Sequence, residues 1–288
     1  HLMDYRKELL SGSRIALARG LSKVENGGRE AEAVLAAVAD RLGNALRIGF
    51  TGPPGAGKSS LVTAYVRLLR KLKKKIAVIA VDPSSPFSGG AVLGDRIRMQ
   101  RHALDEGVFI RSLGTRGTGG GLSRATGEVL RLFDAFGMDV VIIETVGVGQ
   151  TELDIVDIAD TTLVVLVPEA GDTVQTMKAG LMEIADIFIV NKADREGADK
   201  MASDLKSMVE LNNSGVSDWK VPVLLSQANQ EKEEMLSMTE EELAAAEQRA
   251  RQRAAEVDQL SEEKAKQELL IAERENELTQ RKNELMEA

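Results

Sequence analysis

The sequence contains no cysteine, few aromatic residues and no long apolar run. Without cysteine, disulfide bonds, thiolate metal sites and cysteine nucleophiles are excluded. Aromatic residues make up 3% of the 288 residues, which argues against a stacking platform for single-stranded nucleic acid. No apolar run reaches the roughly 18 residues that a membrane-spanning helix requires, and no signal peptide is visible. We therefore expect neither a nucleic-acid nor a membrane partner, and a cytoplasmic location or its matrix-side equivalent.

The excess of negative charge lies at one end of the sequence. The formal net charge is −8, and residues 231–288 alone carry 17 acidic and 9 basic side chains. This segment also lacks glycine, proline and aromatic residues, and pairs such as Glu247–Arg251 stand at helical i,i+4 spacing. One apolar heptad position persists along the segment, but its companion position is mostly polar. We therefore predict a long charged helix whose coiled-coil pairing is weak.

Short β-branched runs alternate with helical stretches from residue 45 onward. The continuous apolar run Val140–Ile143 is typical of a parallel strand that is buried on both faces. The alternation predicts an α/β fold with a mostly parallel, doubly wound sheet flanked by helices. Seven strands are expected, at residues 45–51, 75–81, 108–112, 139–145, 162–168, 187–190 and 221–226.

Apolar residues at helical spacing predict helices within residues 4–42, with a break at Asn26-Gly27-Gly28. The chain is therefore divided into three parts. Residues 1–44 form an N-terminal helical extension, residues 45–230 form the α/β domain, and residues 231–288 form a charged helical or coiled-coil tail.

The run Gly52-Pro53-Pro54-Gly55-Ala56-Gly57-Lys58-Ser59 fits the P-loop pattern G-x-x-x-x-G-K-[ST] between a strand and a helix. Its glycines allow backbone N–H groups to surround a β-phosphate at the positive end of the helix. Lys58 is expected to bridge the β- and γ-phosphates, and the Ser59 hydroxyl is expected to bind Mg²⁺. The alternative is a glycine-rich turn with a chance lysine. The expected nucleotide contacts are Gly52, Pro53, Gly55, Ala56, Gly57, Lys58, Ser59 and Ser60.

A second motif, Asn191-Lys192-Ala193-Asp194, follows the apolar run at residues 187–190. An aspartate at this position can accept hydrogen bonds from guanine N1–H and N2–H₂ together, a pairing that adenine cannot offer. The pattern therefore predicts binding of GTP and GDP, with Asn191, Lys192 and Asp194 as base contacts. The alternative for Asp194 is a helix N-cap.

A glycine-rich run at residues 144–150 lies at the carboxyl end of the strand at 139–145, where α/β sheets place ligand contacts. Gly147 is expected to contact the γ-phosphate, and Glu144 to lie near the water shell of the metal. Gln150 is the one obvious candidate for positioning the attacking water, so hydrolysis without a partner should be slow. Asp82 and Asp95 are further candidate Mg²⁺ ligands. Plain turns are the alternative for the glycine-rich run and for Asp82. The expected catalytic set is Lys58, Glu144 and Gln150.

Four motifs together resemble the G-protein chaperones of adenosylcobalamin-dependent acyl-CoA mutases. They are Gly52–Ser59, Asp82–Arg98, Glu144–Glu152 and Asn191–Asp194. The family includes the methylmalonyl-CoA mutase-associated GTPases (MeaB/ArgK type), once labelled arginine/ornithine transport kinases. The resemblance covers roughly residues 4–226, and it implies that Ser226 and Ala228 lie in the last guanine-contacting loop. It implies a homodimeric GTPase that gates adenosylcobalamin loading onto the mutase, protects or reactivates that enzyme, and has a third switch at Gly171–Lys178.

Alternatives remain at the level of function. A nickel-delivery GTPase would need cysteine and histidine ligands, and the chain has no cysteine and two histidines. A small-molecule P-loop kinase is opposed by the guanine motif. A GTP-switched protein that acts through a C-terminal coiled coil is a further possibility. From Gln227 onward the sequence departs from the family pattern, so the family's dimer contacts are not carried over. Methylmalonyl-CoA, isobutyryl-CoA and 2-hydroxyisobutyryl-CoA mutases are all compatible partners.

Overall fold

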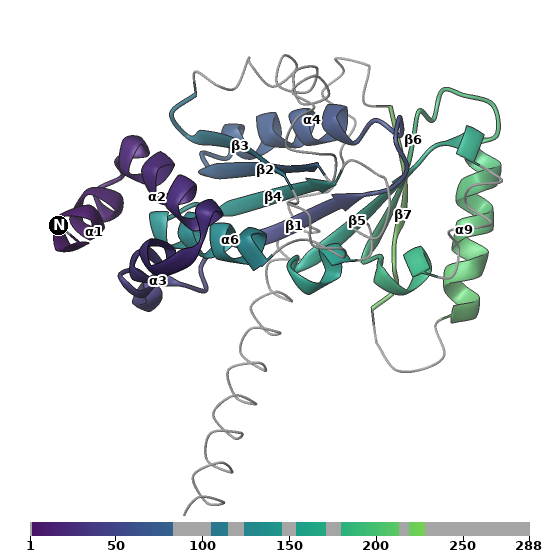
Figure 1. Cartoon of the computed structure of the whole chain (residues 1–288). Coiled ribbons are helices and arrows are strands. Elements are labelled where there is room, and N and C mark those ends of the chain that lie inside the picture. Colours follow the sequence, from purple (N-terminus) through teal and green to yellow (C-terminus); the bar gives the residue numbers. More distant parts are fainter. Residues whose placement is uncertain are drawn as a thin grey trace, which may run out of the picture. The chain divides into compact units, whose positions relative to one another are not determined.

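A seven-stranded parallel sheet forms the centre of the protein (Figure 1), with the strand order β3-β2-β4-β1-β5-β6-β7. The computed structural model describes residues 2–82, 105–114, 124–145, 154–170, 180–212 and 219–227, which all belong to the first of two units in the chain, His1–Ser237. The strands are β1 (Leu46–Thr51), β2 (Ile76–Asp82), β3 (Val108–Gly114), β4 (Val140–Thr145), β5 (Thr161–Leu166), β6 (Ile187–Asn191) and β7 (Val223–Ser226). All seven predicted strands are confirmed, and no bound differs by more than two residues. The predicted fold class is confirmed as well.

The helices account for most of the remaining described residues. They are α1 (Leu2–Leu10), α2 (Arg14–Asn26), α3 (Gly28–Ala36), α4 (Lys58–Lys71), α6 (Arg124–Phe136) and α9 (Ala198–Asn212). Short 3₁₀ turns are η1 (Ala39–Arg41), η2 (Ile155–Asp157) and η3 (Pro168–Ala170). None of the helices in the described part of the chain combines the length and the apolar character needed to cross a bilayer.

The sheet is apolar because helices cover it on both sides. Every residue of β4, β5 and β6 is buried. In Figure 1, α4 lies on one side of the sheet and α6 on the other, while α9 runs beside β6 and β7. Since all strands are parallel, the carboxyl ends of β1, β4, β5, β6 and β7 meet at a single edge. That edge is where a doubly wound sheet binds its ligand.

The N-terminal helices share a hydrophobic core with α6 and with β2 and β4, so residues 1–44 pack directly onto the α/β domain. The helices approach closely at Gly20, where an added Cβ atom would lie 1.9 Å from the Tyr5 hydroxyl oxygen. The predicted break at Gly27 is confirmed, since its amide donates to the carbonyls of Lys23 and Val24. A further break, which we did not predict, lies at residues 11–13. There Gly12 has a φ of 88° and the Ser13 hydroxyl caps the next helix at Ala16 N.

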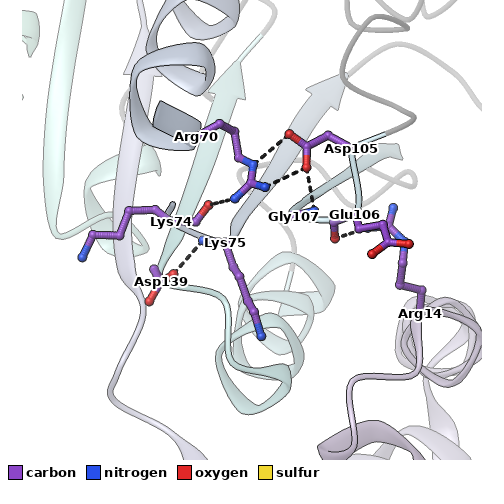
Figure 2. A network of polar contacts seen from close by, with 8 residues as sticks. All are labelled: Arg14, Arg70, Lys74, Lys75, Asp105, Glu106, Gly107 and Asp139. Carbon is purple, nitrogen blue, oxygen red and sulfur yellow. Dashed lines mark hydrogen bonds and ion pairs between the residues drawn. The ribbon is translucent and has the colours of Figure 1, made fainter. Parts of the chain in front are cut away.

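A polar network fixes the amino ends of β2, β3 and β4, at the opposite edge from the candidate site (Figure 2). The Arg70 guanidinium near the end of α4 binds both carboxylate oxygens of Asp105, at 2.8 and 2.9 Å. Asp105 also accepts from the Gly107 amide, and the Asp139 carboxylate accepts from the Lys75 amide at 2.6 Å. Bidentate arginine–carboxylate pairs fix geometry as well as charge. The network therefore sets where β2 and β3 begin.

A buried carboxylate positions the loop that leads into β1. Asp134, on α6, is 5% exposed and accepts hydrogen bonds from the amides of Gly43, Asn44 and Ala45 at 2.5, 3.0 and 2.9 Å. Three donors on one carboxylate hold the three residues that precede the P-loop strand. Asp134 therefore connects α6 to the entry of β1.

We expect Asp134→Ala to lower the free energy of unfolding by about 2–3 kcal/mol, because three backbone donors would lose a charged acceptor inside the protein. Chemical denaturation of the two proteins measures the difference. The control is Arg131→Ala, an exposed residue on the same helix, which should change stability by no more than about 0.5 kcal/mol. Equal effects from the two substitutions would contradict this role for Asp134.

Candidate nucleotide-binding site

The P-loop connects β1 to α4 in a conformation that only glycine can adopt at several points. Gly52, Gly55 and Gly57 have φ values of 131°, 75° and 89°. An added Cβ atom on Gly52 would lie 2.1 Å from the carbonyl oxygen of Val165 in β5. On Gly57 it would lie 2.3 Å from Nδ2 of Asn191. The glycines are therefore required by packing against β5 and β6 as well as by the turn itself.

The lysine and the serine of the P-loop motif lie in the first turn of α4. Lys58 is 5% exposed, and its ammonium group donates to the carbonyls of Gly52 and Pro53 at 2.6 and 2.9 Å. The lysine thus curls back along the loop that precedes it. Ser59, in the same first turn of α4, donates from its hydroxyl to Oε1 of Glu144 at 2.6 Å. Ser60 follows and is half-buried.

Glu144 connects the end of β4 to the P-loop through a hydrogen bond with Ser59. Its side chain is 7% exposed, and its carboxylate receives the Ser59 hydroxyl. The next residue, Thr145, donates to the Thr51 hydroxyl at 3.2 Å, which joins the ends of β4 and β1. A hydroxyl and a carboxylate this close together supply the hard oxygen ligands that suit Mg²⁺. Sequence reasoning missed the Thr51–Thr145 pair, although a threonine at the end of each adjacent strand was a visible signal.

Asp82 ends β2 at the same edge of the sheet. Ala80 pairs with Glu144 and Val81 with Thr145 in the β2–β4 register, so Asp82 follows directly. Only its backbone is among the described residues. Within the described part of the chain, no group of three or more His, Cys, Asp or Glu side chains could hold a metal. Mg²⁺ sites at nucleotides typically use one or two protein ligands, with phosphates and water completing the coordination.

The guanine motif lies directly beside the P-loop. Asn191, at the end of β6, is 2% exposed and donates from Nδ2 to the Ala56 carbonyl at 2.8 Å. The Ala193 amide donates to the Ser226 carbonyl at the end of β7, at 2.9 Å. Lys192 takes a left-handed conformation with a φ of 58°, and Asp194 is exposed. The structure thus brings the two predicted motifs and Ser226 together, and it leaves the Asp194 carboxylate accessible to a base.

Ser226 is 3% exposed, and its hydroxyl oxygen has no hydrogen-bond partner among the described residues. Buried hydroxyls are normally paired, so this one is available to a ligand or to a water molecule. Five further sequence predictions lie outside the described residues. They are Asp95, Gly147, Gln150, Ala228 and the third switch at Gly171–Lys178. The predicted helix at residues 231–288 lies outside them as well.

Comparison with known families gives a match over most of the chain. The model of a family described as methylmalonyl-CoA mutase-associated GTPase MeaB matches residues 17–284. This range confirms the resemblance that the motifs indicated. It also corrects the expected limit of that resemblance at residue 226, because the family match continues through nearly all of the tail.

Individual relatives support the same class. A protein of Pyrococcus horikoshii is 52% identical over 220 residues, which are 76% of this chain and 69% of the relative. GTPase ArgK of Escherichia coli is 41% identical over 205 residues, 70% of this chain and 62% of the relative. The mitochondrial methylmalonic aciduria type A homolog of Mus musculus is 38% identical over 181 residues, 62% of this chain and 44% of the relative.

Among solved structures, one titled LAO/AO transport system kinase has a TM-score of 0.70 at 28% identity. The match covers 93% of this chain and 84% of that chain. It agrees with the P-loop NTPase fold. Together with the named relatives, it confirms the predicted GTPase activity and guanine-nucleotide binding.

The contact between Gly52 and Val165 leads to a test with a matched control. Gly52→Ala should lower the free energy of unfolding by about 3 kcal/mol or more, since the methyl group would meet a backbone carbonyl of the central sheet. Gly55→Ala should cost about 1–2 kcal/mol, because its φ is also positive but no atom lies within 4 Å of the added group. Thermal and chemical unfolding measure both. An equal loss in the two variants would show that conformation alone, without the clash, explains Gly52.

Proposed function

We propose that this chain, which belongs to the family of methylmalonyl-CoA mutase-associated GTPases, is a GTP-hydrolysing chaperone of an adenosylcobalamin-dependent acyl-CoA mutase. In this proposal it gates the loading of adenosylcobalamin onto the mutase and protects or reactivates that enzyme. The family match supports the partner, since the family is described by its association with methylmalonyl-CoA mutase. We further propose that the chain acts as a homodimer.

The observation that carries the nucleotide part of the proposal is the hydrogen bond between Asn191 and Ala56. It places the loop that would select guanine against the loop that would hold phosphates. One GTP molecule must contact the first loop with its base and the second with its phosphates. A GTP site therefore requires the two loops to lie within the length of one nucleotide. Asp194 is then the proposed acceptor for guanine N1–H and N2–H₂. Asn191, Lys192 and Ser226 would complete the base site.

The phosphate end of the site would use residues of the P-loop and of β4. Lys58 already contacts two loop carbonyls, and its ammonium group would turn to the β- and γ-phosphates when a nucleotide binds. Mg²⁺ would neutralise charge on the phosphates. Ser59 and Glu144 fit this ion by ligand type, with Asp82 and Asp95 as further proposed ligands. For water positioning and γ-phosphate contact, Gln150 and Gly147 remain the proposals from sequence.

Base selection provides a direct test. Asp194→Asn should weaken GTP binding by about 2–3 kcal/mol, or about 30- to 150-fold in Kd, because the amide cannot accept both guanine hydrogen bonds. It should improve XTP binding, since the extra carbonyl of xanthine accepts from an amide. Calorimetric titration with both nucleotides measures the change. Asp199→Asn, an exposed aspartate in the first turn of α9, is the control and should leave both affinities unaltered. An unaltered GTP:XTP ratio in Asp194→Asn would remove Asp194 from base recognition.

The partner is tested by measuring GTP turnover with and without a purified mutase. We expect a cognate acyl-CoA mutase to raise kcat for GTP hydrolysis by about 5- to 150-fold, which corresponds to about 1–3 kcal/mol in the activation free energy. Methylmalonyl-CoA, isobutyryl-CoA and 2-hydroxyisobutyryl-CoA mutases are tried in turn, with serum albumin as the control protein. Turnover that none of the three enzymes changes would argue against the chaperone role and leave the GTPase assignment intact.

A further inference from the structure

The guanine loop, residues 191–197, is held to the rest of the protein at three points. Asn191 bonds to the P-loop at Ala56, and the Ala193 amide bonds to Ser226 at the end of β7. Both of these contacts come before Asp194 in the chain. The third contact comes directly after it, where the Arg195 guanidinium forms an ion pair with the Glu169 carboxylate in η3. Asp194 therefore lies between a backbone anchor on one side and a side-chain anchor on the other.

Glu169 faces positive charge from both sides of Asp194. The hydrogen bond from Arg195, together with the charges of Arg195 and Lys192, lowers the pKa of Glu169 below its usual range. Lys192 and Arg195 are also joined by a backbone bond, from the Arg195 amide to the Lys192 carbonyl at 3.0 Å. This bond closes a tight turn with Asp194 inside it. The Glu169 carboxylate thus pairs with Arg195 at one end of the turn that presents Asp194, and it is attracted by the charge of Lys192 at the other end.

The 3₁₀ turn η3 lies beside this loop. Gly197 has a φ of 89°, and an added Cβ atom there would lie 3.9 Å from Cβ of Pro168, the residue before Glu169. The Glu169 and Arg195 side chains are 50% and 48% exposed. Ion pairs this exposed contribute little to folding stability. The pair is therefore poorly suited to stabilising the fold, but it is well placed to restrict the turn around Asp194.

We propose that Glu169 and Arg195 are a positioning pair for guanine recognition. By holding the residue after Asp194, the pair keeps both carboxylate oxygens of Asp194 aimed at N1–H and N2–H₂ of the base. A pair of hydrogen bonds from one carboxylate is sensitive to small rotations of that group. We expect a rotation of the Asp194 carboxylate to weaken the hydrogen bond with N2–H₂ before the one with N1–H. The inference rests on the proposed role of Asp194 in guanine binding.

The test compares guanine with hypoxanthine, which lacks the N2 amino group. Kd values for GDP and IDP are measured by calorimetry, in the presence of Mg²⁺, for the wild-type chain, Glu169→Gln and Arg195→Gln. We expect each substitution to weaken GDP binding about two- to fivefold and to affect IDP less, so that the preference for GDP falls. The charge-swapped double variant Glu169→Arg/Arg195→Glu should recover most of the preference. Melting temperatures should stay close to that of the wild type.

The matched control is Asp40→Asn, which removes another exposed ion pair, with Arg6, in the N-terminal helices. It should leave the affinities for GDP and IDP unaltered. Equal weakening of GDP and IDP by the Glu169 and Arg195 variants would indicate a general structural effect and overturn the positioning role. So would an unaltered preference, or a loss that the charge swap does not recover.

Failure of the underlying guanine assignment gives a different result. In that case the wild type binds GDP and IDP alike, and Asp194→Asn changes neither affinity, which overturns both proposals. A wild type that prefers GDP and depends on Asp194, combined with Glu169 and Arg195 variants that behave like the wild type, overturns the positioning pair alone.

Discussion

One buried hydrogen bond, from the Asn191 side chain to the Ala56 carbonyl, fixes the arrangement of the candidate site. The P-loop follows β1 and the guanine loop follows β6, and β5 lies between these strands in the sheet. The bond therefore reaches across a whole strand. It requires a glycine at position 57 so that the amide can approach, and a glycine at position 52 so that the loop can pass over Val165. The glycines of the P-loop are thus needed for close packing against the sheet as well as for binding phosphates.

The polar side chains that the fold buries are concentrated at the edge where the parallel strands end. Four of them are each less than 8% exposed and lie in or beside the P-loop, the glycine-rich run at residues 144–150 or the guanine loop: Lys58, Glu144, Asn191 and Ser226. Burying such groups is costly unless they are paired. Lys58 and Asn191 donate to loop carbonyls, and Glu144 accepts from the Ser59 hydroxyl. This arrangement explains how an almost entirely apolar sheet can carry a polar site. The site is preorganised by hydrogen bonds among its own residues.

Local patterns in the sequence were sufficient to predict the positions of the strands, of the P-loop and of the guanine loop. Continuous apolar runs such as Val140–Ile143 predict buried parallel strands, and the P-loop and guanine motifs predict a guanine-nucleotide site. The contacts that could not be predicted are those between residues that are distant in the sequence. The Asp134 contacts to residues 43–45 and the Glu169–Arg195 pair depend on which elements become neighbours, and no local pattern encodes that. The break at Gly12 was missed because apolar spacing continues across it.

The order of strands in the sheet also has a consequence for how the chain is made. Leu46 of the central strand β1 pairs with Val140 in β4, which is 94 positions later, and its other neighbour, β5, comes later still. At about 5–20 residues per second, a ribosome needs about 5–20 s to synthesise that interval. During this time the apolar strand Leu46–Thr51 has emerged without either of its partners. Newly made copies of this GTPase therefore expose an apolar strand to other chains until β4 has been synthesised, and slower elongation would lengthen that exposure.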